Sequence, residues 1–237
     1  MIKPVDVLAF GAHPDDIELG AAGTLLSCKA KGKSLGLVDL TRGELGTRGN
    51  PELRRLEATE AASILGADFR YNCGFKDGKF AYDEQHLQLL VSIVRKAKPE
   101  LVLANALEDR HPDHARAAKL VADACFYAGL VQWQDPENLP AHRPRLLLHY
   151  IQFQNLKPDI LLSIDGFFEV KMKSILAYAS QFYKVESQEP ETPISNQTFL
   201  ESLKGRAQDW GKVIGVSHAE GFNSSRPLGV EDLFNLR

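Results

Sequence analysis

The chain has 237 residues, 44% of them hydrophobic and 25% charged, which is the composition of an ordinary globular protein. Its formal net charge is −3 and no dense run of basic residues occurs, so nucleic acid and anionic membrane surfaces are excluded as expected partners. No apolar stretch approaches the length of a membrane span, and no signal-peptide pattern precedes the first apolar run.

Strand-like and helix-like segments alternate along the first half of the chain. Short apolar runs predict strands over 5–10, 35–40, 69–75 and 101–106. Apolar residues at helical spacing predict the intervening helices, over 17–31, 51–65, 83–98 and 114–127. This alternation predicts an α/β fold with a Rossmann-like, doubly wound, mainly parallel sheet and helices on both of its faces.

In the second half of the chain, strand-like and helix-like segments alternate less regularly. We expect strands over 146–153 and 160–164, and helices over 167–182 and 198–213. An acidic segment with two prolines, 186–195, predicts a loop near the edge of the sheet. No shift in composition marks a boundary, so we expect a single domain over 1–237. The three cysteines are widely spaced and form no CxxC pair, which indicates a reducing compartment and a cytoplasmic protein.

Two clusters of imidazole and carboxylate side chains follow predicted strands. The first is Ala12-His13-Pro14-Asp15-Asp16, after the first strand, and the second is His111-Pro112-Asp113-His114, after the fourth. A doubly wound sheet usually places these two strands side by side, at the point where strand order reverses and ligands bind. We therefore expect the clusters to meet, although about a hundred residues separate them. The first turn lacks a GxGxxG fingerprint, so the expected site is not a dinucleotide cradle.

These residue types suit a hydrolytic divalent-metal site. A catalytic zinc takes three protein ligands and a water. The side chains of Asp15 and Asp16 diverge because the residues are adjacent, so we expect one to bind the metal and the other to reach the water. His114 is a candidate third ligand. His111 is then free to polarise a carbonyl oxygen, with Asp113 holding its ring and favouring the protonated form.

A different class of protein remains open. In a non-catalytic sugar- or nucleotide-binding module, the acidic residues would only cap helices. Such a module needs no spare carboxylate beside the metal ligands, so the pair Asp15 and Asp16 favours an enzyme. Metal analysis of the purified protein separates the two possibilities.

The two motifs resemble those of the PIG-L family of zinc-dependent N-acetylglucosamine deacetylases, also called LmbE-like. Further segments are similar to the bacillithiol biosynthesis deacetylase subgroup, namely residues 40–49, 51–54, 219–222 and 226–228. The resemblance runs essentially from end to end. It implies hydrolytic removal of the acetyl group from an N-acetylglucosaminyl conjugate, with Zn²⁺, or Fe²⁺, as the cofactor. It also implies a homo-oligomer, either a trimer or a hexamer.

The resemblance further implies a role for each residue of the site. Asp15 would be the general base, and His111 the electrophilic or acid partner, oriented by Asp113. The implied metal ligands are His13, Asp16 and His114. The implied substrate contacts are Arg54, Glu44 and Asp77, the last two with sugar hydroxyls.

Basic side chains suggest which sugar conjugate is the substrate. The cations expected at this edge of the sheet are Arg42, Arg48, Arg54 and Lys76. A neutral chitooligosaccharide has no obvious use for them, whereas malate carries carboxylates, which the arginine fork binds well. We therefore predict N-acetylglucosaminyl malate as the substrate and Arg54 as the carboxylate contact, with another N-acetylated amidosugar such as a chitooligosaccharide as the alternative. His218 is a further candidate for the pocket wall.

Overall fold

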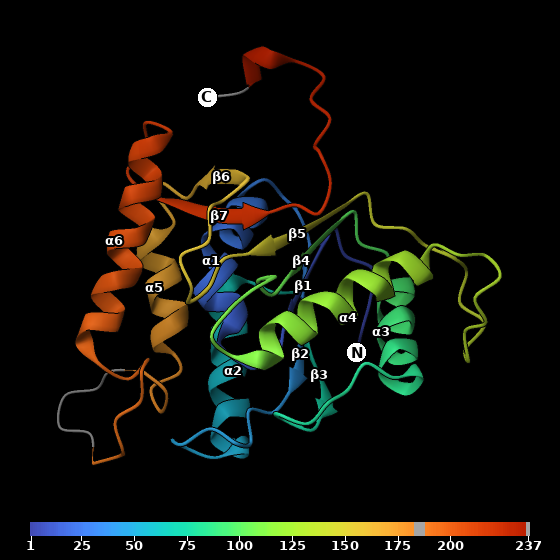
Figure 1. Cartoon of the computed structure of the whole chain (residues 1–237), viewed down its shortest axis with the longest axis horizontal. Helices are drawn as coiled ribbons and strands as arrows, with labels where there is room; N and C mark the ends of the chain where they lie inside the picture. The colour runs from blue at the N-terminus through green and yellow to red at the C-terminus, as the bar shows by residue number, and fades with distance from the viewer. Residues whose placement is uncertain (183–187, 236–237) are drawn as a thin grey trace.

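The computed structural model describes residues 1–182 and 188–235 (Figure 1). Its elements in chain order are β1 (Val7–Gly11), α1 (Asp16–Ala30), β2 (Leu35–Thr41), α2 (Pro51–Leu65), β3 (Phe69–Phe75), α3 (Glu84–Ala97), β4 (Leu101–Ala104), α4 (Pro112–Ala128), β5 (Leu146–Tyr150), β6 (Ile160–Ser163), α5 (Phe168–Leu176), α6 (Gln197–Val213), β7 (Ala219–Asn223) and a 3-10 turn (Leu233–Asn235).

The strands of the described residues form one sheet in the order β3-β2-β1-β4-β5-β7-β6. The first five strands of the chain run parallel, whereas β7 is antiparallel to both of its neighbours, β5 and β6. This arrangement confirms the predicted doubly wound, mainly parallel fold. Strand order reverses between β1 and β4, which pair directly, with Val7 opposite Leu101. The carboxyl ends of these two strands therefore lie together, as ligand binding in such sheets requires.

Helices cover both faces of the sheet, and alternation along β1 shows why. Successive side chains of a strand point to opposite faces. Val7 and Ala9 join the core under α1 and α2, whereas Leu8 and Phe10 join the core under α3 and α4. Figure 1 shows α3 and α4 on one side of the sheet and α1, α2, α5 and α6 on the other.

Close packing fixes the position of α1. At Gly20 a Cβ atom would overlap the ring of Tyr150 on β5, so only glycine lets the helix lie this near the sheet. The hydroxyl of Tyr150 in turn donates a 2.7 Å hydrogen bond to the carbonyl oxygen of Phe10. The N-terminus of α1 is thereby held at the carboxyl end of β1.

The second half of the chain differs from prediction in three places. The strand predicted over 146–153 ends at Tyr150. The helix predicted over 167–182 is wrong beyond Leu176, because Ser180 turns inward and both its backbone N and its hydroxyl donate to the carboxylate of Glu57. The strand β7 is not predicted from sequence, since Ala219–Asn223 contains no β-branched residue and has a glycine at its centre. Of the predicted loop 186–195, the first two residues lie outside the described residues, and 188–195 is indeed a loop.

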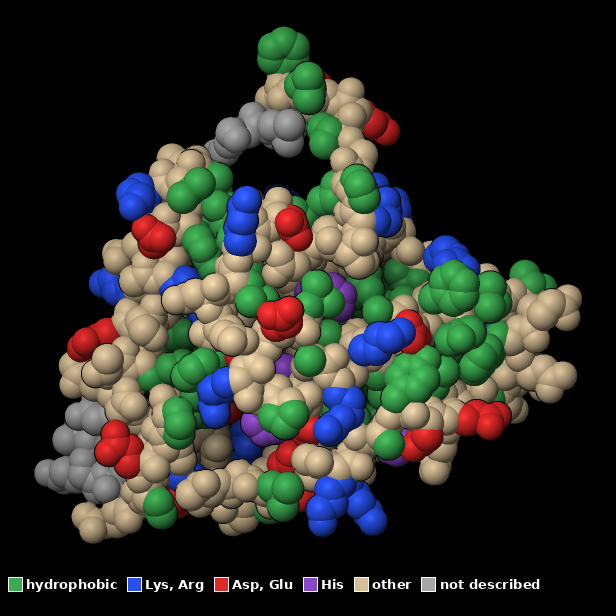
Figure 2. Space-filling view, viewed as in Figure 1, with side chains coloured by type: hydrophobic (Ala, Val, Ile, Leu, Met, Phe, Trp, Pro, Cys, Tyr) green, Lys and Arg blue, Asp and Glu red, His purple; other side chains and the backbone are tan. Residues whose placement is uncertain are grey.

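Charged side chains of both signs are interspersed over the face seen in Figure 2. Beyond β7 the chain leaves the body of the protein, carrying the exposed side chains of Leu233 and Phe234. Among the described residues, no helix is long and apolar enough to cross a membrane.

Candidate active site

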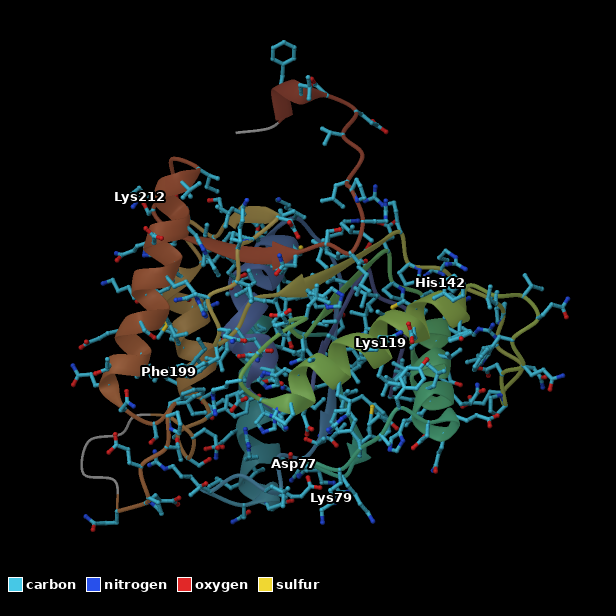
Figure 3. All side chains as sticks on the ribbon, viewed as in Figure 1. Asp77, Lys79, Lys119, His142, Phe199 and Lys212 are labelled. Carbon is cyan, nitrogen blue, oxygen red and sulfur yellow. The ribbon has the colours of Figure 1, made fainter. Side chains whose placement is uncertain are left out.

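A cavity of about 290 Å³ opens at the carboxyl edge of the sheet. Its walls come from the segments after β1, β2, β3, β4 and β5 and from the start of α6. Figure 3 labels two of its lining residues, Asp77 and Phe199, which come from distant elements of the fold. The two predicted motifs meet here, with the ring centroids of His13 and His114 5.5 Å apart. The prediction that the two clusters meet is confirmed.

Asp16 lies between these two histidines. Its Oδ2 is 3.6 Å from Nδ1 of His13, and its Oδ1 is 3.2 Å from Nε2 of His114. The amides of Asn105 and Gln152 also donate to this carboxylate, over 2.9 and 2.8 Å. Asn105 and Gln152 follow β4 and β5, so three strand ends fix the carboxylate of Asp16 in place. Sequence reasoning missed both amides, which lie near the carboxyl ends of the strands predicted over 101–106 and 146–153.

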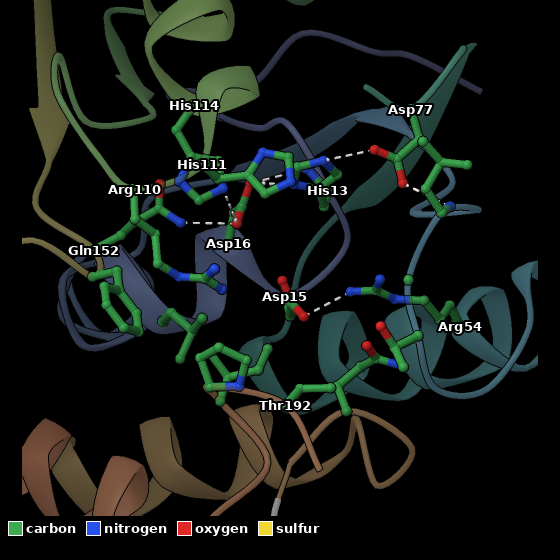
Figure 4. A pocket seen from close by; sticks show the side chains of 18 of the residues that line it. His13, Asp15, Asp16, Arg54, Asp77, Arg110, His111, His114, Gln152 and Thr192 are labelled. Carbon is green, nitrogen blue, oxygen red and sulfur yellow. Dashed lines mark hydrogen bonds and ion pairs between the residues drawn. The ribbon is translucent and has the colours of Figure 1, made fainter. Parts of the chain in front are cut away.

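In both His13 and His114, the ring nitrogen that points away from Asp16 contacts a second carboxylate. Oδ1 of Asp77 is 3.1 Å from Nε2 of His13, and Oδ2 of Asp109 is 2.9 Å from Nδ1 of His114. Each imidazole therefore turns its other nitrogen toward Asp16 (Figure 4). Histidines that bind metals usually have such an outer partner, which fixes the tautomer and the orientation of the ring. Asp109 is a further residue that the sequence analysis missed.

The donor chemistry fits a divalent metal ion. Imidazole and carboxylate are ligands of zinc and of ferrous iron. In the described part of the chain, two groups have possible ligand atoms that all lie within 4.8 Å of one another, namely His13 with His111 and His114, and His13 with Asp77 and Asp113. Asp16 belongs to neither group, although each of its oxygens faces one of the two predicted histidine ligands. The structure thus has a candidate metal centre, and the predicted ligand set stays a prediction.

Asp15 lines the cavity beside this centre and is 4% exposed. Its backbone has φ 109°, in the left-handed region that non-glycine residues rarely adopt. Burial raises the pKa of Asp15 to about 7, although the nearby guanidinium of Arg54 opposes the rise. A carboxyl group with a pKa near neutrality can both accept and return a proton.

Arg54 is the partner of Asp15. Its Nη2 donates to Oδ2 of Asp15 over 2.7 Å and to the carbonyl oxygen of Pro14 over 2.6 Å. Its Nη1 lies 3.4 Å from the carbonyl oxygen of Gly43. The guanidinium predicted to bind a substrate carboxylate is therefore already engaged by the chain itself.

His111 is held differently from the prediction. The carboxylate of Asp113 does not hold its ring but faces His13, with Oδ2 3.4 Å from Nε2, and accepts from the backbone N of Gly78 over 2.8 Å. Nδ1 of His111 instead accepts from the backbone N of Asp113 over 3.3 Å. The reason is that Asp113 lies in the first turn of α4, where its backbone is nearest to the histidine that precedes the helix.

The protonation of His111 also differs from the prediction. Burial lowers its pKa, as do the neighbouring His13 and His114, and Asp113 only partly offsets them. A neutral ring whose Nδ1 accepts a hydrogen bond carries its proton on Nε2. His111 can therefore still donate a hydrogen bond toward the cavity, as a neutral imidazole.

The remaining predicted residues are more scattered. Oε1 of Glu44 accepts from the backbone N of Asp77 over 2.8 Å, so this pair organises the loops rather than presenting free oxygens to a sugar. Among the described residues, the basic side chains lining the cavity are Arg54 and Arg110, and not Arg42, Arg48 or Lys76. His218 lies elsewhere, stacked on Phe168 with a centroid distance of 4.3 Å.

A doubly wound sheet with imidazoles, carboxylates and a spare acid at its switch point suits the chemistry of a metal-dependent hydrolytic enzyme. Comparison with known proteins agrees with this class. Residues 8–125 match the model of the PIG-L family, described as GlcNAc-PI de-N-acetylase. The solved structure of the conserved protein TT1542 from Thermus thermophilus is 37% identical, with a TM-score of 0.87 over 97% of this chain and 98% of that one. The chain belongs to the PIG-L family.

Curated relatives extend over most of the chain. A diacetylchitobiose deacetylase from Thermococcus kodakarensis is 28% identical over 91% of this chain and 81% of its own length. A probable N-acetyl-alpha-D-glucosaminyl L-malate deacetylase from Bacillus anthracis is 27% identical over 74% of this chain and 81% of its own. A 4-oxalmesaconate hydratase from Pseudomonas putida is 26% identical over 95% of this chain and 91% of its own. Similar proteins thus include both amide hydrolases and a hydratase.

Proposed function

We propose that this protein is a metal-dependent N-deacetylase that acts on an N-acetylglucosaminyl conjugate. The observation that carries the proposal is the buried carboxylate of Asp15, which lines a sugar-sized cavity beside the cluster of His13, Asp16 and His114. Amide hydrolysis needs a group that takes a proton from water and returns it to the leaving amine, and a carboxyl of raised pKa is suited to both steps.

We infer that Zn²⁺, or Fe²⁺, binds to His13, Asp16 and His114. Such an ion, when bound, supplies Lewis acidity for the carbonyl oxygen and makes water acidic enough to attack at neutral pH. The outer partners support this ligand set, because Asp77 and Asp109 leave one nitrogen of each ring turned toward Asp16. Neutral imidazoles and an ionised carboxylate are the forms that bind a metal.

The other residues would act on protons and on charge. Asp15 takes the proton of the attacking water and passes it to the amine as the carbon–nitrogen bond breaks. Nε2–H of His111 donates to the oxygen of the tetrahedral intermediate, whose negative charge exists only after attack begins. Arg54 holds the carboxylate of Asp15 in position through the 2.7 Å ion pair.

We propose N-acetylglucosaminyl malate as the preferred substrate, and therefore a step of bacillithiol biosynthesis. The similar malate-conjugate deacetylase supports this choice, and so does the cavity, since about 290 Å³ is near the lower end of ligand sites and suits one sugar with a small substituent. A chitooligosaccharide is the alternative, supported by the similar diacetylchitobiose deacetylase. We further infer a single-domain cytoplasmic protein that assembles as a trimer or hexamer, from the family resemblance.

The test is product analysis with the purified, metal-loaded protein. N-acetylglucosaminyl malate, diacetylchitobiose and 4-oxalmesaconate are supplied separately, and products are identified by mass spectrometry. We expect the loss of one acetyl group from the malate conjugate, fastest of the three. Addition of water to 4-oxalmesaconate without any deacetylation would replace the proposal with a hydratase.

A further inference from the structure

Among the residues that the structure describes, one guanidinium in the cavity wall forms no ion pair with a carboxylate. Of the two basic residues that line the cavity in the described chain, Arg54 is already bonded to Asp15 and to backbone carbonyl oxygens. The other is Arg110, which immediately precedes His111. In the described part of the chain, its side chain forms no ion pair with an aspartate or glutamate within 4.0 Å. Its guanidinium lies over the ring of Phe153, 4.6 Å from the centroid.

The backbone on both sides of this stack is anchored by one residue. The carboxylate of Asp109 accepts from the backbone N of Arg110 over 2.7 Å and from those of Phe153 and Gln154 over 3.3 and 3.1 Å. The same carboxylate holds Nδ1 of His114. The Arg110 and Phe153 stack is thus fixed relative to the candidate metal centre. Figure 4 shows Arg110 reaching from the loop before α4 into the cavity.

The charges around the cavity favour an anion at this place. Near the metal centre the lining includes the carboxylates of Asp15, Asp16 and Asp77, which would repel an anionic group of a substrate. Among residues 1–182 and 188–235, no carboxylate forms an ion pair with Arg110, and its planar fork matches the two oxygens of a carboxylate. Stacking on an aromatic ring keeps the fork extended, so less side-chain freedom is lost when a ligand binds.

We propose that Arg110, supported by Phe153, determines substrate specificity by binding a carboxylate on the group attached to the sugar. This inference rests on the proposed function, and it moves the carboxylate contact from Arg54 to Arg110. The amide of the sugar would then lie at the metal centre, and the acidic substituent would lie against the stack at the mouth of the cavity.

The experiment compares N-acetylglucosaminyl malate with the uncharged methyl glycoside of N-acetylglucosamine. For wild type, Arg110→Gln and Arg110→Lys, kcat/KM is measured on both substrates, and binding is measured by calorimetry. We expect Arg110→Gln to weaken binding and lower kcat/KM for the malate conjugate by about 10- to 100-fold, the usual effect of losing a hydrogen bond to a charged group. The methyl glycoside should be nearly unaffected, and Arg110→Lys should be intermediate.

A matched control is Arg143→Gln, which removes a guanidinium that lies 5.0 Å from the ring centroid of Phe126, outside the cavity lining. This variant should leave kcat/KM and binding unchanged for both substrates. Equal losses on both substrates in Arg110→Gln would overturn the proposal, because the residue would then support the site in general. The calorimetric arm separates this result from failure of the proposed function. A wild type that deacetylates neither compound refutes the deacetylase, whereas a charge-selective affinity that disappears in Arg110→Gln still supports the carboxylate contact.

Discussion

Of two buried clusters of ionisable side chains beside α1, one at Lys171 and Glu220 and the other at Asp15 and Asp16, only the second has the properties of an active site. Near the middle of the helix, Nζ of Lys171 donates to Glu220 over 2.6 Å and to the carbonyl oxygen of Leu19 over 2.8 Å. The other oxygen of Glu220 accepts from the backbone N and the hydroxyl of Thr24. The cavity beside this cluster measures about 10 Å³, which is room for about one water.

At the N-terminus of the same helix, carboxylates and imidazoles crowd together around a cavity of about 290 Å³. There burial raises the pKa of Asp15 to about 7, and a group with such a pKa can exchange a proton at neutral pH. The comparison shows that buried charge alone does not identify a site. Buried charge together with space for a ligand and an available proton acceptor does.

The largest expected effect tests the metal centre itself. We expect His114→Ala to lose stoichiometric metal and measurable deacetylation, because it removes one of the three proposed ligands, the ring that Asp109 holds. Metal content by elemental analysis and secondary structure by circular dichroism are measured side by side. A folded variant that still holds one equivalent of zinc would show that the ligand set is wrong.

Asp15→Asn comes next, because it keeps the shape of the side chain but removes its ability to accept a proton. Turnover should fall by about 10²- to 10⁴-fold, as for other positioned acid–base groups, with metal content unchanged. Steady-state kinetics on metal-loaded protein decide this. Near-normal turnover would exclude Asp15 as the base.

The third effect concerns His111, whose pKa is lowered by burial. We expect His111→Ala to lower kcat by about 10²- to 10³-fold and to leave KM nearly unchanged, because the donated hydrogen bond matters only after the oxyanion forms. Separate measurement of kcat and KM is required. A change confined to KM would make this residue a substrate contact.

The smallest effect on turnover is expected for a change in the cluster of Lys171 and Glu220. Lys171→Met should lower the free energy of unfolding by about 3 kcal/mol, since Glu220 is left buried without its cation. The folded fraction should retain nearly wild-type kcat. Urea denaturation gives the stability, and kinetics below the transition give the turnover. A large loss of turnover in fully folded protein would contradict the prediction that this cluster serves stability and not catalysis.

Local signals in the sequence predicted most of the elements. Pro51 at the first position and Gly66 after the last bound α2 as expected, and the side chain of Asp83 caps α3 by accepting from the backbone N of His86. The extent of α5 could not be predicted, because its end depends on the contact of Ser180 with Glu57, which is distant in the sequence.

The sequence predicted those features of the site that follow from the topology of the sheet and the chemistry of the two motifs. The clusters meet because β1 pairs with β4, a consequence of the alternation of strands and helices. Which carboxylate faces which ring depends on side-chain distances that the sequence does not contain. Asp77 therefore faces His13 rather than a free sugar site, and Asp109 was missed. For the same reason, the sequence could not show which arginine is available to bind a substrate carboxylate. Only the structure shows that Asp15 already binds Arg54 and not Arg110.

The backbone of Asp15 also bears on how this protein evolves. At φ 109° a glycine would adopt this backbone more readily than an aspartate, by something on the order of 1 kcal/mol. Loss of the carboxylate would, however, leave the guanidinium of Arg54 buried without its 2.7 Å partner, at a cost of about 3–5 kcal/mol. A descendant copy released from catalysis, for example one kept only to bind sugars, should therefore gain stability at this position only if Arg54 changes together with Asp15.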